Sequence, residues 1–301
     1  MDKLLALRVF MDVAQTGGFS RAAQRRAVAT SSVTRLIDGL EASLGVALLT
    51  RSTRQVTLTD AGAAYLEQVA RLLSDLDEAD ASVADGGSEA VGPLRVSVPV
   101  SFGRLCVGPH IAAFLRAHPR VSLELVLSDA YVDLAAERID VAVRIGTPEH
   151  HPQLIVRPLA GHRRHVVASP GYLACHGTPA RPEDLALHEC LRFAYQAGPQ
   201  RWSFLRGGAV QAVEVDGRLA ANNADILREA ALGGSGIALL AQWLVEEDVR
   251  AGRLQRLFAD YAINPQDQDV NIHAAWLPNR RHSRKVHAFV DFLQRHMPCA
   301  S

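Results

Sequence analysis

The chain has 301 residues, of which 48% are hydrophobic and 21% are charged, so it can bury a substantial core and divide into two or more domains. Its 32 Lys and Arg residues balance 32 Asp and Glu residues, which excludes a chain that is basic throughout. No apolar run reaches the roughly 18 residues that a membrane-spanning helix needs, so we expect no membrane contact.

The N-terminal stretch predicts one helix followed by a helix-turn-helix. An apolar stripe of Leu4, Leu7, Phe10 and Val13 places the first helix at residues 4–14, and a Gly-Gly pair ends it. Residues 20–40 then read as two short helices joined by a tight turn. Ser20 is positioned to cap the first of these two helices through its hydroxyl group.

The second helix of this pair has two contrasting faces. Its apolar face carries Val33, Leu36, Ile37 and Leu40, which leaves Ser31, Ser32, Arg35 and Asp38 pointing away from the core. Small residues let a helix approach base edges, and Arg is a bidentate donor to guanine, so the outer face suits the DNA major groove. Residues 1–60 also hold eight Lys and Arg against five Asp and Glu. An ordinary amphipathic helix pair is the alternative.

Residues 48–58 predict a hairpin, because two β-rich pieces flank a polar tip. A hairpin directly after a helix-turn-helix is a wing, and Arg51 and Arg54 at its tip can reach flanking phosphates or the minor groove. Two arginines that are simply solvated are the alternative.

A long helix is expected from Thr59-Asp60 to about Asp85. Leu66, Val69, Leu73, Leu76 and Val83 follow a heptad spacing along it. Because a small winged module should offer this helix nothing to pack on, the seam predicts a homodimer through the same helix of a second copy. Packing against its own chain is the alternative. Residues 85–92 read as a flexible linker.

From Pro93 onward, short β runs alternate with helices, which predicts parallel or mixed sheets in two α/β lobes. The expected strands are 94–98, 121–127, 140–145, 165–169, 237–240 and 272–277, and the expected helices are 107–118, 132–137, 224–232 and 282–296.

Three motif blocks at the N-terminus resemble the LysR-type transcriptional regulators. They are Phe10-x-x-Val13-Ala14-x-x-Gly17-Gly-Phe19-Ser20-x-Ala22-Ala23, Ser31-Ser-Val-Thr-Arg35-Leu-Ile37-x-x-Leu40-Glu41-x-x-Leu44-Gly45, and Leu48-Leu49-x-Arg51-x-x-Arg54-x-Val56-x-Leu58-Thr59-x-Ala61-Gly62. Four further stretches are similar to that family's effector domain: Gly92-Pro-Leu-Arg-Val-Ser, Asp140-Val-Ala-Val-Arg-Ile-Gly146, Ala168-Ser-Pro-x-Tyr-Leu173 and Ala231-Leu-x-Gly-x-Gly-Ile-Ala238. The resemblance therefore runs through the whole chain.

The resemblance implies an α/β protein with an all-α-rich N-terminal winged helix-turn-helix and a C-terminal two-lobed α/β effector domain resembling periplasmic binding proteins. The implied domains are 1–59 for DNA binding, 60–91 for the dimerising linker helix and hinge, and 92–301 for the effector. Within the last, lobe 1 spans about 92–161 and 267–301, and lobe 2 about 162–266. The implied partners are double-stranded DNA, a small-molecule effector and further copies in a homodimer or homotetramer, with RNA polymerase as an additional candidate.

The residues expected to contact DNA are Ser20, Arg21, Thr30, Ser31, Ser32, Thr34, Arg35, Arg51, Thr53 and Arg54. Three positions depart from the family pattern. Ala29 stands where a capping Ser is usual, so Thr30 would have to cap the recognition helix. Arg26 replaces a usual Leu, either as a phosphate contact or as a solvated side chain, and Leu49 replaces a frequent Phe.

An effector is expected in the cleft between the lobes, at strand ends and helix N-termini. Ser101-Phe102-Gly103 follows the first strand, and its hydroxyl and free N–H groups suit a carboxylate. Ser128, Arg144 and Gly146 end neighbouring strands at the same edge, and Asn222 and Asn223 match the family's cleft position. A structural role as cap, turn or packed polar group is the alternative for each.

No enzyme or metal chemistry is predicted. The chain lacks Gly-x-Ser-x-Gly and phosphate-loop motifs, so we assign no catalytic residue and no cofactor. His150-His151 and the other histidine pairs lack helical i, i+4 spacing with a carboxylate, and the four cysteines lack metal or disulfide spacing. With no secretory signal, we expect a cytoplasmic protein. A solute-binding module or an enzyme on a two-lobed scaffold are the alternative classes.

Overall fold

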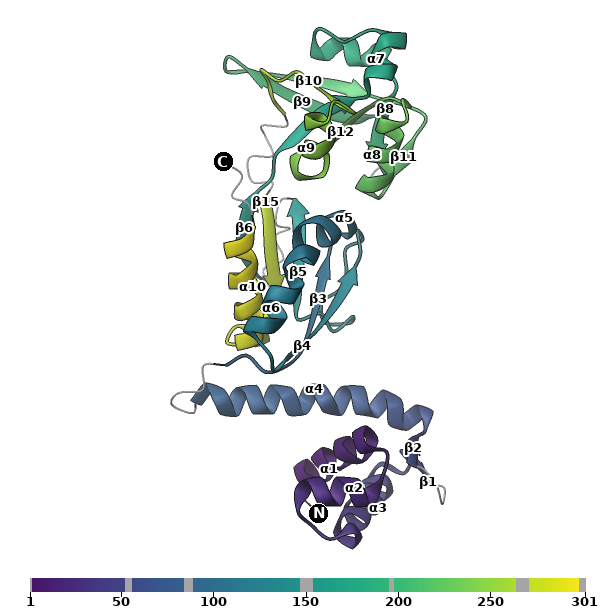
Figure 1. Ribbon diagram of the computed structural model, residues 1–301, viewed down its shortest axis with the longest axis vertical. Coiled ribbons are helices and arrows are strands. Elements are labelled where there is room, and N and C mark those ends of the chain that lie inside the picture. The colour runs from purple at the N-terminus through teal and green to yellow at the C-terminus, as the bar shows by residue number, and fades with distance from the viewer. Residues whose placement is uncertain are drawn as a thin grey trace. The chain divides into compact units, whose positions relative to one another are not determined.

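The computed structural model describes residues 2–51, 56–83, 89–146, 154–194, 198–263 and 271–297 (Figure 1). The chain divides into two compact units, Met1–Pro93 and Leu94–Ser301, each with its own hydrophobic core. Among the described residues, no helix is long and apolar enough to cross a membrane.

The first unit is a helix-turn-helix followed by a hairpin and a long helix. Its elements are α1 (Lys3–Thr16), α2 (Phe19–Arg26), α3 (Thr30–Leu44), β1 (Leu49–Arg51), β2 (Val56–Leu58) and α4 (Asp60–Val83). Gly17, at φ 66°, ends α1 in the left-handed conformation. The predicted capping role of Ser20 is wrong, because α2 begins at Phe19, has Gly18 as its N-cap and includes Ser20 as a helical residue. Thr30 does not cap α3 either: it is the first helical residue, and its N-cap Ala29 has no side-chain acceptor.

The core of the first unit forms where the apolar faces of its helices meet. Its buried members are Ala6, Leu7, Val9, Phe10, Val13, Ala22, Ala23, Val33, Ile37, Leu40, Leu48, Leu49, Val69 and Leu73. Val69 and Leu73 belong to α4 and are only 3% and 1% exposed. The expectation that α4 has nothing to pack on in its own unit is therefore wrong, since part of the predicted seam lies in this core. Leu72, in contrast, is 53% exposed.

The second unit contains two five-stranded mixed sheets and one three-stranded sheet, which confirms the α/β prediction. The strands are β3 (Gly92–Val98), β4 (Val121–Leu127), β5 (Val141–Gly146), β6 (Ile155–Gly161), β7 (Arg164–Ala168), β8 (Cys190–Phe193), β9 (Gln200–Arg206), β10 (Ala209–Val215), β11 (Ala220–Ala221), β12 (Ile237–Ala241), β13 (Gln255–Leu257), β14 (Ala262–Ile263) and β15 (Asn271–Trp276). The orders are β4-β3-β5-β15-β6, β11-β8-β12-β7-β13 and β10-β9-β14.

We call the first of these sheets with its helices the first lobe, and the other two sheets with theirs the second lobe. The helices are α5 (Val100–Phe102), α6 (Ile111–Ala117) and α10 (Arg284–His296) in the first lobe, and α7 (Pro170–His176), α8 (Ala224–Leu232) and α9 (Gln242–Arg250) in the second. Phe114 of α6 meets Phe289 and Phe292 of α10, in each case with ring centroids 5.3 Å apart. Figure 1 shows the strands and helices of both lobes. The chain passes from the first lobe to the second between β6 and β7.

Two expected elements of the second unit differ from the structure, and the structure adds a hairpin that we did not predict. The helix expected from residue 107 begins at Val100 and runs on through a π-helical segment, Gly103–Val107, and a 3₁₀ turn before α6. The helix expected at 132–137 is a series of turns. There Asp133 accepts hydrogen bonds from the N–H groups of Ala135 and Ala136, which compete with helix formation. The β9–β10 hairpin was not expected, although its Gly207-Gly208 turn is a recognisable hairpin signal.

Candidate DNA-binding and effector-binding sites

The outward face of α3 is open to solvent. Ser31 and Arg35 are exposed, while Ser32 and Thr34 are half-buried. The Thr34 hydroxyl donates to the carbonyl oxygen of Thr30 at 3.1 Å. The Arg35 guanidinium makes no hydrogen bond or ion pair with the described residues. It is therefore a cation available to a ligand outside the chain.

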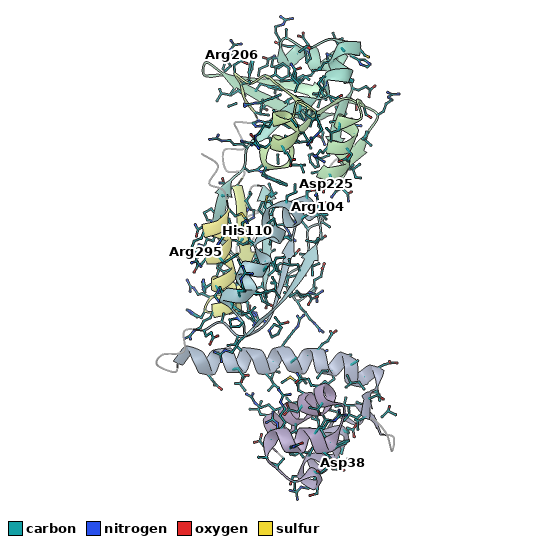
Figure 2. The ribbon with its side chains drawn as sticks, viewed as in Figure 1. Asp38, Arg104, His110, Arg206, Asp225 and Arg295 are labelled. Atoms are coloured by element: carbon teal, nitrogen blue, oxygen red, sulfur yellow. The ribbon has the colours of Figure 1, made fainter. Side chains whose placement is uncertain are left out.

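The other residues expected to contact DNA lie around α3. Ser20 and Arg21 are exposed on α2, and Arg21 donates to the carbonyl oxygen of Gly17 at 3.3 Å. Arg51 lies in β1, but its side chain lies outside the described residues, as do Thr53 and Arg54. Asp38, which is also exposed, lies on α3 (Figure 2).

Arg26 is paired within the chain rather than simply solvated. Its Nε donates to Asp12 Oδ2, and Arg25 Nη1 lies 3.5 Å from Asp12 Oδ1. Asp12 is 5% exposed, so this carboxylate joins α1 to α2 from within the unit. The signal in the sequence was a single acidic residue within the apolar stripe of the first helix, between Val9 and Val13.

We expect Asp12→Asn to lower the free energy of unfolding of the first unit by about 1–3 kcal/mol, because two arginines lose a charged acceptor at a buried position. Urea unfolding followed by circular dichroism measures this change. The matched control is Asp77→Asn, since Asp77 is 53% exposed and pairs with Arg8 at 2.5 Å. An exposed pair contributes at most about 1 kcal/mol. Equal losses in the two variants would contradict the structural role of Asp12.

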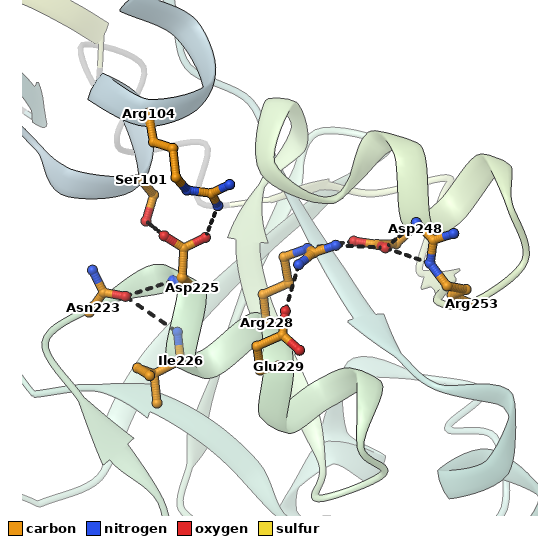
Figure 3. Close-up of polar contacts among 9 residues, drawn as sticks. All are labelled: Ser101, Arg104, Asn223, Asp225, Ile226, Arg228, Glu229, Asp248 and Arg253. Atoms are coloured by element: carbon orange, nitrogen blue, oxygen red, sulfur yellow. Dashed lines mark hydrogen bonds and ion pairs between the residues drawn. The ribbon is translucent and has the colours of Figure 1, made fainter. Parts of the chain in front are cut away.

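In the second unit, the predicted turn at Ser101 meets carboxylates of the chain itself. The Ser101 hydroxyl donates to Asp225 Oδ2 at 2.8 Å, and Arg104 Nη2 lies 2.5 Å from Asp225 Oδ1 (Figure 3). The N–H of Val100 donates to Asp129 Oδ1 at 3.0 Å. The expectation that this hydroxyl and the first N–H of the helix are free for an external carboxylate is therefore wrong for this conformation.

The Asn222-Asn223 pair begins the second-lobe helix α8. Asn223 is its N-cap, and its Oδ1 accepts from the N–H groups of Asp225 and Ile226 at 3.0 and 3.3 Å. The Asn223 amide also donates to Asp129 Oδ2 at 2.8 Å. Asn222 is exposed. Asn223 thus caps the start of α8 and also contacts the first lobe.

Phe102 and Gly103 pack rather than present polar groups. Phe102 is 1% exposed and meets Trp243 of α9 edge-to-face, with ring centroids 5.4 Å apart. A Cβ atom on Gly103 would lie 2.6 Å from Leu127 Cδ2 and 2.7 Å from Val98 Cγ2. Gly103 is therefore required by the close approach of these side chains.

The remaining cleft candidates lie at strand ends of the first lobe. The Ser128 hydroxyl accepts from the N–H of Ala130 at 3.2 Å, and Gly146 has φ 142°. Arg144 donates to Ser97 Oγ at 3.0 Å and to backbone carbonyl oxygens, and it has no carboxylate partner among the described residues. Burial lowers the pKa of Arg144 from its usual value. Its guanidinium is thus partly desolvated and not neutralised by an ion pair.

His162 lies at the crossover between the lobes. Its Nδ1 is buried without a hydrogen-bond partner among the described residues. Burial, together with the charge of Arg164, lowers the pKa of His162 to about 4. The folded chain therefore holds this imidazole neutral at a pH where an unfolded chain protonates it.

The stability that His162 contributes is complete above pH 6.5 and is lost as the pH falls toward 4. At pH 5 we expect a loss of about 2 kcal/mol relative to neutral pH. His162→Gln should remove this part of the slope. Urea unfolding of the wild type and of His162→Gln, each at neutral pH and at pH 5, measures the difference. Both proteins carry His165 and His273, so the contributions of these two residues cancel. Parallel slopes in the two proteins would contradict this role.

Several residues that join the two lobes were not predicted from the sequence: Arg104, Asp129, Asp225 and Trp243. Asp129 and Asp225 each lie within two residues of a predicted candidate, Ser128 and Asn223, so proximity was the available signal. The sequence around each aspartate does not indicate which hydrogen-bond donor its carboxylate contacts.

No metal or redox site is indicated by the described residues. They contain no group of three His, Cys, Asp or Glu side chains that could hold a metal ion. His150 and His151 lie outside the described part. Cys106, Cys175 and Cys190 are free, and burial raises the pKa of Cys106 to about 11 and of Cys190 to about 12. These two thiols stay protonated at neutral pH.

A winged helix-turn-helix followed by a two-lobed α/β unit is the architecture of a ligand-responsive DNA-binding regulator. Residues 4–63 match the family described as bacterial regulatory helix-turn-helix protein, lysR family, and residues 87–298 match the LysR substrate binding domain. The chain belongs to the LysR-type family of transcriptional regulators, which are not enzymes. As in that family, an N-terminal helix-turn-helix is joined to an effector-binding domain.

The relatives match over nearly their full length. The transcriptional regulator CrgA of Neisseria meningitidis is 34% identical over 287 residues, covering 95% of this chain and 94% of CrgA. PtxR of Pseudomonas aeruginosa is 35% identical over 291 residues, with 97% and 92% covered. The solved structure of CrgA has a TM-score of 0.60 at 33% identity, covering 96% of this chain and 97% of CrgA. Full-length AphB of Vibrio cholerae has a TM-score of 0.59 at 28% identity, covering 98% and 99%.

Proposed function

We propose that α3 enters the DNA major groove and reads base edges with Arg35, Ser31, Ser32 and Thr34. The observation that carries this proposal is the exposed Arg35 guanidinium, which has no partner among the described residues. A bidentate arginine contact to guanine supplies specificity, while the small side chains beside it allow close approach. Ser20, Arg21, Thr30, Arg51, Thr53 and Arg54 would add contacts to the sugar-phosphate backbone.

The effector would bind between the two lobes of residues 92–301, near Ser101, Ser128, Arg144 and Asn223. Residues 1–59 would bind DNA, and residues 60–91 would link and dimerise the protein. Leu72 of α4 and Leu4 and Leu5 of α1 are 53%, 44% and 40% exposed, which supports a homodimer through this unit. Two such dimers would form a tetramer on DNA in the cytoplasm, where RNA polymerase is a further partner.

The mechanism is linkage between the two sites. An effector that favours one arrangement of the lobes favours one spacing of the paired DNA-binding units. The effector would control DNA binding or bending in this way, because a dimer binds two half-sites together only when their spacing matches that of its two recognition helices.

Fluorescence anisotropy tests this function. The full chain is titrated against the DNA upstream of its own gene and against a scrambled duplex, at several salt concentrations. Preferential binding whose logarithm falls linearly with the logarithm of salt concentration supports the proposal and counts phosphate contacts. Absence of binding even at low salt would favour a solute-binding module instead.

A further inference from the structure

The two lobes are joined by side chains whose charges and hydrogen bonds are complementary. Ser101 and Arg104 come from the first lobe, and Asp225 comes from α8 of the second (Figures 2 and 3). Both oxygens of the Asp225 carboxylate are engaged, one by the hydroxyl and the other by the guanidinium. In a second contact between the lobes, the second lobe supplies the donor: the Asn223 amide donates to Asp129 Oδ2 of the first lobe at 2.8 Å.

Asp225 moves as part of the second lobe, because α8 is anchored there. Arg228 of the same helix donates to both oxygens of Asp248 at 2.6 and 2.8 Å, and Arg253 donates to Asp248 Oδ1 at 2.8 Å (Figure 3). The Asp248 side chain is fully buried. The internal ion pair fixes α8 to its lobe, so the Asp225 contacts break when the lobes separate.

The Arg104–Asp225 contact differs from this buried anchor in its access to solvent. The side chain of Arg104 is 54% exposed and that of Asp225 is 23% exposed. A hydroxyl and a guanidinium that hold both oxygens of a carboxylate form an anion-binding position. Ser101 is only 3% exposed, so solvent reaches this position from the Arg104 side, where a carboxylate from solution can exchange with that of Asp225.

We propose that Asp225 is an internal competitor that occupies the carboxylate position formed by Ser101 and Arg104. It holds the two lobes together, and a carboxylate-bearing effector displaces it, so that binding is coupled to a change in the arrangement of the lobes. This inference rests on the proposed binding of an effector in the cleft. The apparent affinity for the effector is then the intrinsic affinity multiplied by the fraction of molecules in which Asp225 has left the position.

Acrylamide quenching of tryptophan fluorescence measures how far the two lobes are in contact in the full-length protein. Trp202 and Trp276 are 4% and 3% exposed, so acrylamide chiefly reports Trp243, whose ring contacts Phe102 of the other lobe. Losing two hydrogen bonds to a carboxylate should shift the ratio of joined to separated lobes by roughly tenfold or more. We therefore expect stronger quenching in Asp225→Ala than in the wild type. Glu229→Ala, which removes another α8 carboxylate that is paired within its own lobe, should leave quenching unchanged.

Sodium acetate, compared with sodium chloride at equal ionic strength, probes the anion position. Saturation-transfer NMR should show Asp225→Ala binding acetate about tenfold more tightly than the wild type, because the internal competitor is gone. The Asp225→Ala/Arg104→Ala double variant should lose this gain. Equal quenching and equal acetate binding in Asp225→Ala and Glu229→Ala would overturn the proposal. DNA affinity, measured on the same variants, separates this outcome from failure of the proposed function, in which no variant binds DNA.

Discussion

Arg35→Ala is expected to weaken binding to the upstream DNA by about 10- to 100-fold, the range of one lost bidentate contact to a base. The guanidinium is exposed on α3 and has no partner among the described residues, so its removal should leave the fold intact. The same substitution should reduce affinity for a scrambled duplex far less, because that duplex offers mainly phosphates. Anisotropy titrations on both duplexes measure the ratio.

The control for this variant is Arg250→Ala. Arg250 is also an exposed helical arginine, with 73% of its side chain accessible, but it lies on α9 in the second unit. It should bind both duplexes as the wild type does. If Arg35→Ala retains wild-type preference for the upstream DNA, then α3 does not read bases through this residue.

Gly62→Ala is expected to destabilise the first unit by about 3 kcal/mol, through overpacking that the backbone cannot relieve. A Cβ atom at this position would lie 1.9 Å from the carbonyl oxygen of Leu48. That segment is held in place, because Glu41 Oε1 accepts from the N–H of Leu48 at 2.7 Å. The Leu48 carbonyl also accepts from the N–H of Thr59 at 3.0 Å. The helix α4 therefore begins against the entry to the hairpin, and only glycine fits.

Urea unfolding of the full chain measures this loss, with Gly171→Ala as the control. Gly171 is also helical, and a Cβ atom there would meet nothing within 4 Å, so that variant should be neutral or slightly stabilised. Because Gly62 packs against Leu48 at the entry to the hairpin, we expect DNA affinity to fall with stability if the hairpin contacts DNA as proposed. A Gly62→Ala protein as stable as Gly171→Ala would show that the Leu48 segment can move aside.

Much of the local structure follows from the order of residues alone. The spacing of Val33, Ile37 and Leu40 predicts the buried face of α3, and all three are fully buried in the structure. The alternation after Pro93 predicts mixed sheets in the same way, because burial of one face imposes a period on the sequence. Helix boundaries were less predictable, since Gly18 and Ala29 take N-cap positions for which the sequence pointed to hydroxyl side chains.

Contacts between distant side chains could not be read from these patterns. Asp225 and Ser101 are 124 positions apart, and Asp12 and Arg26 are 14 apart. The residue type shows which hydrogen bonds a carboxylate, a hydroxyl or a guanidinium can make. It does not show which partner lies close enough to make them. That choice depends on how the sheets and helices pack, because hydrogen bonds form only within a few tenths of an ångström of about 3 Å. The residue order therefore sets the elements and the family, while packing sets whether the Ser101 hydroxyl meets a ligand or the carboxylate of Asp225.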